Sequence, residues 1–176
     1  MITNEMYESF FARLKNLSRG EKATLKRAAG TMIADADAKT LSVFYQCLPR
    51  GVPRYQEDRW FAVACLRCLW DADGANGEPF EVVFGRMRAA GDITDSTAHR
   101  AEGLLDTAWD TDGFMLSKLA RLVKLVHQKT NKAPIDFTAL LMDLLAWNNK
   151  SNYVQRNWAR AIFTANYTEK NQNTNE

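Results

Sequence analysis

Three cysteines come closer than any other residues in this sequence to forming a metal or redox site. Cys65 and Cys68 form a C-x-x-C pair, and Cys47 is a possible third ligand. A zinc site needs four converging ligands, usually presented from a turn, whereas this pair lies within an apolar stretch with no histidine at ligand spacing. The strand and helix pattern that surrounds a redox C-x-x-C is also missing. We therefore expect buried structural cysteines, with no metal ion and no cofactor.

General acid–base chemistry has equally little support. His99 and His127 are the only side chains that ordinarily titrate near neutral pH, and neither has a Ser, Cys or carboxylate partner at motif spacing. The loop that begins at Asp71 resembles a calcium loop, but Asn76 stands where the turn needs Gly and Val82 where a bidentate acid is needed. No glycine-rich phosphate loop occurs. We expect a polar turn at Asp71 and a protein that is not an enzyme.

The charged residues are unevenly distributed, although the formal net charge is only +2. Residues 9–30 and 114–160 are rich in lysine and arginine and carry few acids, whereas residues 51–112 contain more acids than bases. A distribution of this kind indicates what a protein binds and says little about its fold. It fits either ordinary solvated helix faces or a surface that holds a polyanion.

The spacing of the basic residues favours the polyanion. On an expected helix over residues 114–128, Lys118, Arg121 and Lys124 recur at i, i+3 and i+6, opposite an apolar stripe. Like charges on one helix face repel mildly, and phosphates would supply the missing partners while releasing counterions. No helix carries an obvious set of base-reading side chains, so we expect backbone contacts. The basic residues selected by spacing are Arg19, Lys22, Lys26, Arg27, Lys118, Arg121, Lys124, Arg156 and Arg160.

The elements that must position these residues are all expected to be helices, because no stretch alternates like a strand. Ser18 and Glu21 form a capping box, and Asp95 and Asp136 are expected to cap later helices. A boundary between two helical halves is expected around residues 91–95, with the WDTDG turn at 109–113 as the alternative. The helices are predicted over residues 4–16, 19–29, 39–48, 55–70, 80–90, 95–108, 114–128, 137–145 and 152–165.

Two further features concern the location of the protein. No apolar run is long enough to span a bilayer, and the N-terminal segment has two acids before its first base, unlike a signal peptide. An odd number of cysteines fits a reducing compartment better than a disulfide framework. We expect a cytoplasmic protein with no membrane partner.

The order of these motifs resembles the CasB family, the small subunit of the type I-E CRISPR surveillance complex Cascade. The resemblance covers about Leu14 to Tyr167, and it depends on the order of segments that are individually weak. Those segments are RLKNLSRGEKATLKRAAG, VFYQCLP, PRYQEDRWFAVACL, FGRMRAAG, HRAEGLLD, LSKLARLVKLV and IDFTALLMDLLAWNNKSNYVQRNWARAIFTANY.

The resemblance implies an all-α fold of two small packed helical bundles, residues 1–92 and residues 93–167, followed by a disordered polar tail at 168–176. It implies a non-catalytic subunit whose partners are other Cascade subunits and a second copy of itself. Such a subunit would contact the backbones of crRNA and target DNA and stabilise the R-loop and its displaced strand. Strand exchange in an R-loop is nearly balanced, so backbone contacts can tip it.

The resemblance also implies that the basic residues of the family correspond to Arg27, Arg54, Lys118, Arg121 and Arg156 of this sequence. One departure is the segment NNKSNY after Trp147, which is less basic than in many relatives, so the last helix is expected to contribute less. The alternative function is a helical adaptor that docks acidic protein partners without nucleic acid.

Overall fold

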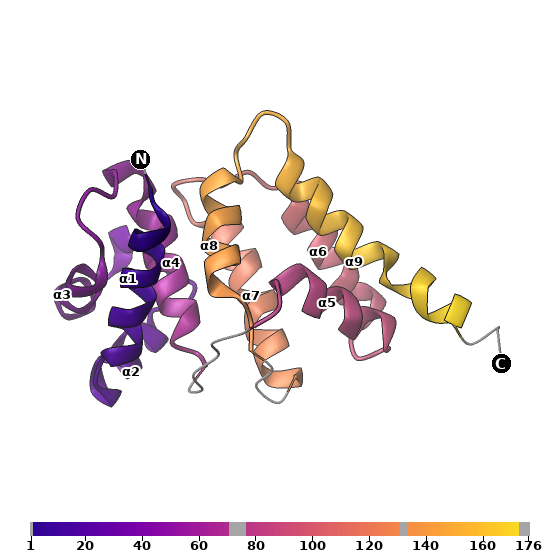
Figure 1. The fold of residues 1–176 in the computed structure, drawn as a ribbon, viewed down its shortest axis with the longest axis horizontal. Helices are drawn as coiled ribbons and strands as arrows, with labels where there is room; N and C mark the ends of the chain where they lie inside the picture. The colour runs from indigo at the N-terminus through magenta and orange to yellow at the C-terminus, as the bar shows by residue number, and fades with distance from the viewer. Residues whose placement is uncertain (1, 71–76, 131–133, 173–176) are drawn as a thin grey trace.

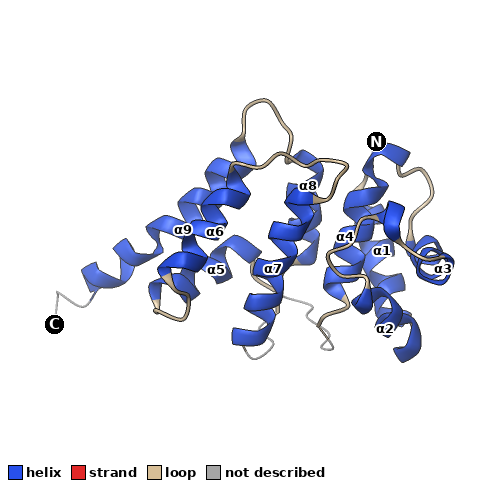
Figure 2. Cartoon of the chain, turned by 180° about the vertical axis from the view of Figure 1, so that it is seen from behind, coloured by secondary structure: helices blue, strands red, loops and turns tan. Residues whose placement is uncertain are grey.

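The computed structural model of the chain describes residues 2–70, 77–130 and 134–172, with side chains described through residue 165. Within these ranges the regular structure is nine α-helices and two short 3-10 helices, with no strand, which confirms the predicted all-α class (Figures 1 and 2). The elements are α1 (Asn4–Asn16), α2 (Arg19–Arg27), η1 (Ile33–Asp35), α3 (Ala38–Cys47), η2 (Arg54–Gln56), α4 (Glu57–Arg67), α5 (Phe80–Ala89), α6 (Asp95–Leu105), α7 (Phe114–Lys129), α8 (Phe137–Ala146) and α9 (Tyr153–Gln172).

The helix starts follow from capping chemistry. The capping box is confirmed: the Ser18 hydroxyl accepts from the Glu21 amide, and the Glu21 carboxylate accepts from the Ser18 amide at 2.8 Å. Asp136 caps α8 as predicted, accepting from a backbone amide at 2.9 Å. The predicted Asp95 cap is wrong, because Thr94 occupies the cap position and Asp95 is the first helical residue. Both side chains can cap a helix, so the sequence did not decide between two adjacent candidates.

Several helix ends differ from the prediction. The stretch predicted as one helix over residues 55–70 begins with the 3-10 turn η2 and continues as α4, which ends at Arg67. The helix α6 ends at Leu105, three residues before the expected end. The backbone of α9 runs to Gln172 and includes residues 168–172 of the predicted tail. Residues 173–176, and residues 131–133 of the loop before α8, lie outside the described residues.

The helix α4 is the most deeply buried element, as its apolar composition predicted. Every residue from Trp60 to Leu66 is buried. In Figure 1, α1 to α4 lie on one side, α7 and α8 lie in the middle, and α5, α6 and α9 lie on the other side. Since α4 packs against α2, α7 and α8, it joins the N-terminal helices to the centre of the molecule.

The helices α5 and α9 make the closest helix pair. A Cβ atom added at Gly85 would lie 2.3 Å from the Ala161 carbonyl oxygen, so only glycine permits this approach. Phe80 of α5 and Trp158 of α9 pack with ring centroids 5.3 Å apart. The predicted division at residues 92 and 93 stays a prediction, and this packing favours grouping α5 with the later helices.

Two carboxylates lie against the α9 core. The Trp158 indole Nε1 donates to Asp143 Oδ2 at 2.7 Å. Burial raises the pKa of Asp143 above its usual range, and burial likewise raises the pKa of Glu81. A buried carboxylate favours its protonated form, so this part of the core is sensitive to pH.

We predict that Gly85→Ala lowers the free energy of unfolding by about 1–3 kcal/mol, because the methyl group overlaps α9 backbone. Urea unfolding followed by circular dichroism measures the change. Gly20→Ala is the matched control, since a Cβ there meets nothing within 4 Å and alanine favours a helix. Equal stability of Gly85→Ala and the original chain would contradict the close packing.

Asp143→Asn tests the buried carboxylate. The folded-state pKa of Asp143 is raised, so its contribution to stability is present at low pH and is lost as pH rises through that pKa. Asparagine keeps an oxygen that can accept from Trp158 but never ionises. We expect the variant to gain stability relative to the original chain as the pH rises from about 4 to about 7, measured by thermal unfolding. A difference that stays constant with pH would refute the assignment.

Candidate nucleic-acid interface

The cysteines are inert, as predicted. Cys47, Cys65 and Cys68 are all buried and free. Burial raises the pKa of Cys47 to about 11 and that of Cys68 to about 11, and it raises the pKa of Cys65 as well. A thiol is a nucleophile or a metal ligand only as the thiolate, so these side chains stay unreactive near neutral pH.

The histidines differ in part from the prediction. His99 does have a carboxylate partner: its Nδ1 atom lies 2.9 Å from Glu102 Oε2, one helical turn along α6. This hydrogen bond raises the pKa of His99 above its usual value. Both side chains are exposed, so the pair is a surface contact. The i, i+3 spacing was the signal that could have revealed it. The ring of His127 packs edge-on against Trp70.

Neither a metal site nor a membrane span occurs in the described ranges. No group of three or more His, Cys, Asp or Glu side chains there could hold a metal ion. The calcium-like loop falls mainly on residues 71–76, which lie outside the described residues. None of the described helices is both long and apolar enough to cross a bilayer.

The predicted basic residues are mostly on the surface. Lys22 and Lys118 are half-buried, and the others are exposed: Arg19, Lys26, Arg27, Arg54, Arg121, Lys124, Arg156 and Arg160. The ion pairs found between described residues, Arg86 with Glu78 and His99 with Glu102, include none of them. These residues therefore make no ion pair with a described carboxylate, although the charge of Arg27 acts on Asp37.

Lys118 serves the fold. Its Nζ atom donates to the Gly103 carbonyl oxygen at 3.0 Å and to Thr107 Oγ1 at 2.8 Å. It also lies 4.5 Å from the centre of the Phe114 ring. A cation at the carbonyl end of a helix is stabilising, so Lys118 fastens the end of α6 to α7. This contact leaves Lys118 less available for a phosphate than the spacing alone implied.

Lys124, six residues further along α7, makes a similar contact with the end of another helix. Its Nζ atom donates to the carbonyl oxygen of Ala29, just beyond α2, at 2.9 Å. A Cβ added at Gly30 would lie 3.1 Å from Ala120 Cβ, so the end of α2 lies directly against α7. Arg121, between the two lysines, is exposed and makes no hydrogen bond or ion pair with a described residue.

The predicted basic residues lie near opposite ends of α4. The helices α4 and α8 run antiparallel, so the start of α4 lies beside the end of α8. Near the start of α4, Arg59 Nε donates to the Leu144 carbonyl oxygen at 3.0 Å. Near its end, the Arg67 guanidinium lies 5.9 Å from the centre of the Phe137 ring. Residues beside the start of α4 and residues beside its end therefore lie about 16 Å apart along that helix.

The α2–α7 basic region comprises Lys22, Lys26, Arg27, Arg121 and Lys124. The charges of Lys22 and Lys26 act on the Cys68 thiol, which places them near the end of α4. The contact of Lys124 with Ala29 brings the α7 residues beside the α2 residues.

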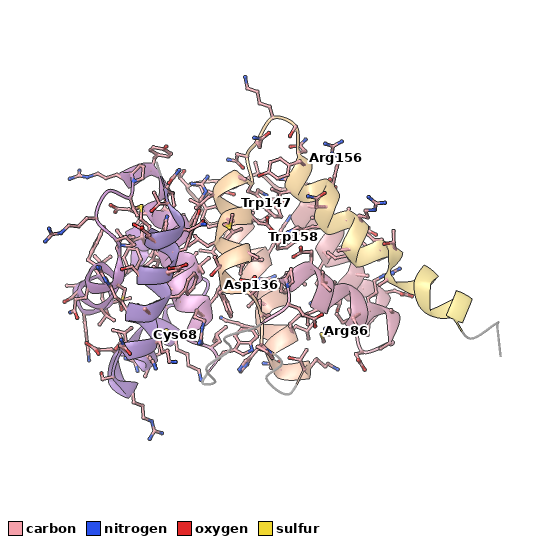
Figure 3. All side chains as sticks on the ribbon, in the orientation of Figure 1. Cys68, Arg86, Asp136, Trp147, Arg156 and Trp158 are labelled. Atoms are coloured by element: carbon pink, nitrogen blue, oxygen red, sulfur yellow. The ribbon has the colours of Figure 1, made fainter. Side chains whose placement is uncertain are left out.

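Arg156 and Arg160 lie elsewhere, on α9, and Arg54 precedes the start of α4. In Figure 3, Arg156 lies at the upper edge of the molecule and Cys68 near its lower edge. The structure thus unites the α2 and α7 residues and leaves the α9 arginines apart.

Two tryptophans, Trp109 and Trp147, are core residues. Trp109 is 7% exposed and Trp147 is fully buried, with its Nε1 donating to the Thr107 carbonyl oxygen at 2.8 Å. The side chain of Tyr167 lies outside the described residues.

The sequence analysis missed Lys150 and Gln155, which line a cavity with Trp147 and Arg156. Neither residue stands out by spacing, because a turn and a helix start bring them together.

The described residues thus form an all-helical protein with exposed basic side chains on several helices. The family model described as "CRISPR-associated protein Cse2" matches residues 21–163. Since this match covers most of the chain, the chain belongs to the Cse2 family, also called CasB, which is the small subunit of type I-E Cascade. The family predicted from the order of motifs is confirmed.

Solved structures share the fold. The crystal structure of M. ruber CasB aligns over 100% of both chains with a TM-score of 0.73 and 21% identity. A Cse2-family protein from Thermus thermophilus aligns with a TM-score of 0.69 and 26% identity, covering 89% of this chain and 96% of that one. A chain of a CRISPR RNA-guided surveillance complex aligns with a TM-score of 0.74 and 20% identity, covering 96% and 98%. No curated protein matches the chain by sequence.

We predict that Lys118→Met lowers the free energy of unfolding by about 1 kcal/mol, since it removes charge-assisted hydrogen bonds to α6. Arg121→Ala, on the same helix, should change stability by less than about 0.5 kcal/mol because its side chain is exposed. Chemical unfolding of both variants gives the comparison. If the two variants lose the same stability, the capping role of Lys118 is wrong.

Proposed function

We propose that this chain is the non-catalytic small subunit of a CRISPR RNA-guided surveillance complex and that it holds backbone phosphates of the R-loop. The ligand is the crRNA–target DNA duplex together with the displaced strand. Support comes from membership of the Cse2 family and from the fold shared with a chain of such a complex. The other subunits of the complex and a second copy of this chain are its protein partners.

The observation that carries the proposal is the exposed position of Arg121 on α7. This residue lies between two lysines that are engaged with the ends of α6 and α2. A guanidinium with no described carboxylate partner suits a phosphate, which it can contact through two parallel hydrogen bonds. Lys26 and Arg27 are exposed near the end of α2, which Lys124 of α7 contacts at Ala29. Each phosphate neutralised on such a surface releases a condensed counterion, which favours binding.

Backbone contacts suit the energetics of an R-loop. The RNA–DNA duplex that forms is about as stable as the DNA duplex that it replaces, so a modest additional free energy decides the outcome. Cations that contact phosphates supply that free energy for any target sequence. The guide RNA reads the sequence, and this chain needs to recognise only backbone and shape.

The double variant Lys26→Ala with Arg121→Ala tests the function. We expect weaker binding to every sequence, and a slope of log affinity against log salt reduced by about 0.9 for each duplex phosphate that the variant no longer binds. In a reconstituted complex the R-loop should dissociate faster. Arg100→Ala, which removes an exposed arginine of α6 outside the predicted set, is the matched control.

An unchanged salt slope together with an unchanged R-loop lifetime would refute the proposal. A pull-down from nuclease-treated lysate separates it from the adaptor alternative. If the double variant loses protein partners while its nucleic-acid binding stays intact, the basic surface docks acidic proteins instead.

A further inference from the structure

A cavity of about 930 Å³ lies between the end of α6 and the start of α9. Its volume is in the range of sites that hold small ligands. The turn between α8 and α9 closes it from the third side. Its lining residues are Glu102, Leu105, Asp106, Thr107, Ala108, Trp147, Asn148, Asn149, Lys150, Asn152, Gln155, Arg156 and Ala159.

The walls of this cavity are fixed by internal hydrogen bonds. The Asn148 side chain accepts from the Trp109 amide at 2.8 Å and donates to the Trp109 carbonyl oxygen at 3.0 Å. The fully buried Trp147 is held by Thr107 through its indole nitrogen. A cavity with walls fixed in this way keeps its shape without a ligand, so binding costs little ordering of the protein.

Gln155 is held in the wall of the cavity by a hydrogen bond. Its Nε2 atom donates to the Trp147 carbonyl oxygen at 2.6 Å, which fixes the orientation of the amide. Its Oε1 atom is buried and makes no hydrogen bond to a described residue. Gln155 therefore forms part of the fixed wall of the cavity.

The charges of the lining residues favour a ligand with two kinds of group. Lys150 and Arg156 are exposed and attract an anion, while the exposed carboxylate of Asp106, just beyond α6, accepts hydrogen bonds. A nucleotide carries both groups, since its phosphate is anionic and its base has amino or imino N–H donors.

We propose that this cavity holds one unpaired nucleotide, with its base directed toward Asp106 and its phosphate contacted by Lys150 and Arg156. The proposal rests on the proposed function, because it assigns a place on this chain to a nucleotide of a single strand. It goes beyond backbone contact, since a base inserted here is recognised through its N–H donors. Bases with an exocyclic amino group therefore bind more tightly than thymine.

Ala159→Phe tests this proposal without removing a hydrogen bond. The added ring fills the cavity, and the removal of base contacts should weaken binding of a single-stranded oligonucleotide about tenfold. The salt slope should fall by no more than about 0.7, the value for the one single-strand phosphate held beside the cavity, because the phosphate contacts elsewhere remain. Asn157→Phe adds the same ring to an exposed position of α9 that does not line the cavity, and it should bind like the original chain. Thermal unfolding verifies that both variants fold.

A fluorescent base gives a second readout. An oligonucleotide with one 2-aminopurine should brighten when the original full-length chain draws that base out of its stack, and Ala159→Phe should abolish this increase. Equal affinity and equal fluorescence for both phenylalanine variants would overturn the nucleotide site. The proposed function would still hold in that case if Lys26→Ala with Arg121→Ala reduces the salt slope. If Ala159→Phe weakens association with other purified complex subunits and leaves oligonucleotide binding unchanged, the cavity holds a protein segment and the nucleotide site is overturned.

Discussion

Two lysines of α7 join this helix to the ends of two neighbouring helices. Lys118 binds the carbonyl end of α6, and Lys124 binds the carbonyl end of α2. Helix ends leave backbone carbonyls without partners, and a cation on a neighbouring helix satisfies them. The apolar stripe of α7 is buried as well, so this helix is fixed by its core packing and by the two lysine contacts. Arg121 lies between these two lysines and makes no such contact with a described residue, so it remains available to a ligand.

The cysteine thiols and the Asp143 carboxyl in the described interior favour their neutral forms. Burial keeps the thiols of all three cysteines protonated, and it raises the pKa of Asp143. The large aromatic side chains, such as Trp147 and Trp158, pack against each other in the core. What the chain presents to a partner is therefore charge, shape and a polar cavity.

The surface combines two kinds of contact that do different work. The α2–α7 basic region offers positive charge without described carboxylate partners, which suits phosphates of any sequence. The cavity beside α9 offers acceptors and cations together, which suits a single unpaired nucleotide. A subunit that tips a nearly balanced strand exchange gains from both, because a duplex presents phosphates and a displaced strand also exposes its bases.

The sequence by itself determined the helical class, the capping box at Ser18, the buried cysteines and the family, because each depends on local spacing or on the order of segments. It did not distinguish Arg121 from Lys118, which have the same spacing on the same helix face. Only the tertiary structure decided that Lys118 is engaged with α6 while Arg121 is not, since that depends on which helix end lies nearby. The cavity at Gln155 was equally hidden, because its walls come from segments about 40 residues apart, such as Thr107 and Trp147. Spacing along one helix reveals its faces, and only packing shows what covers them.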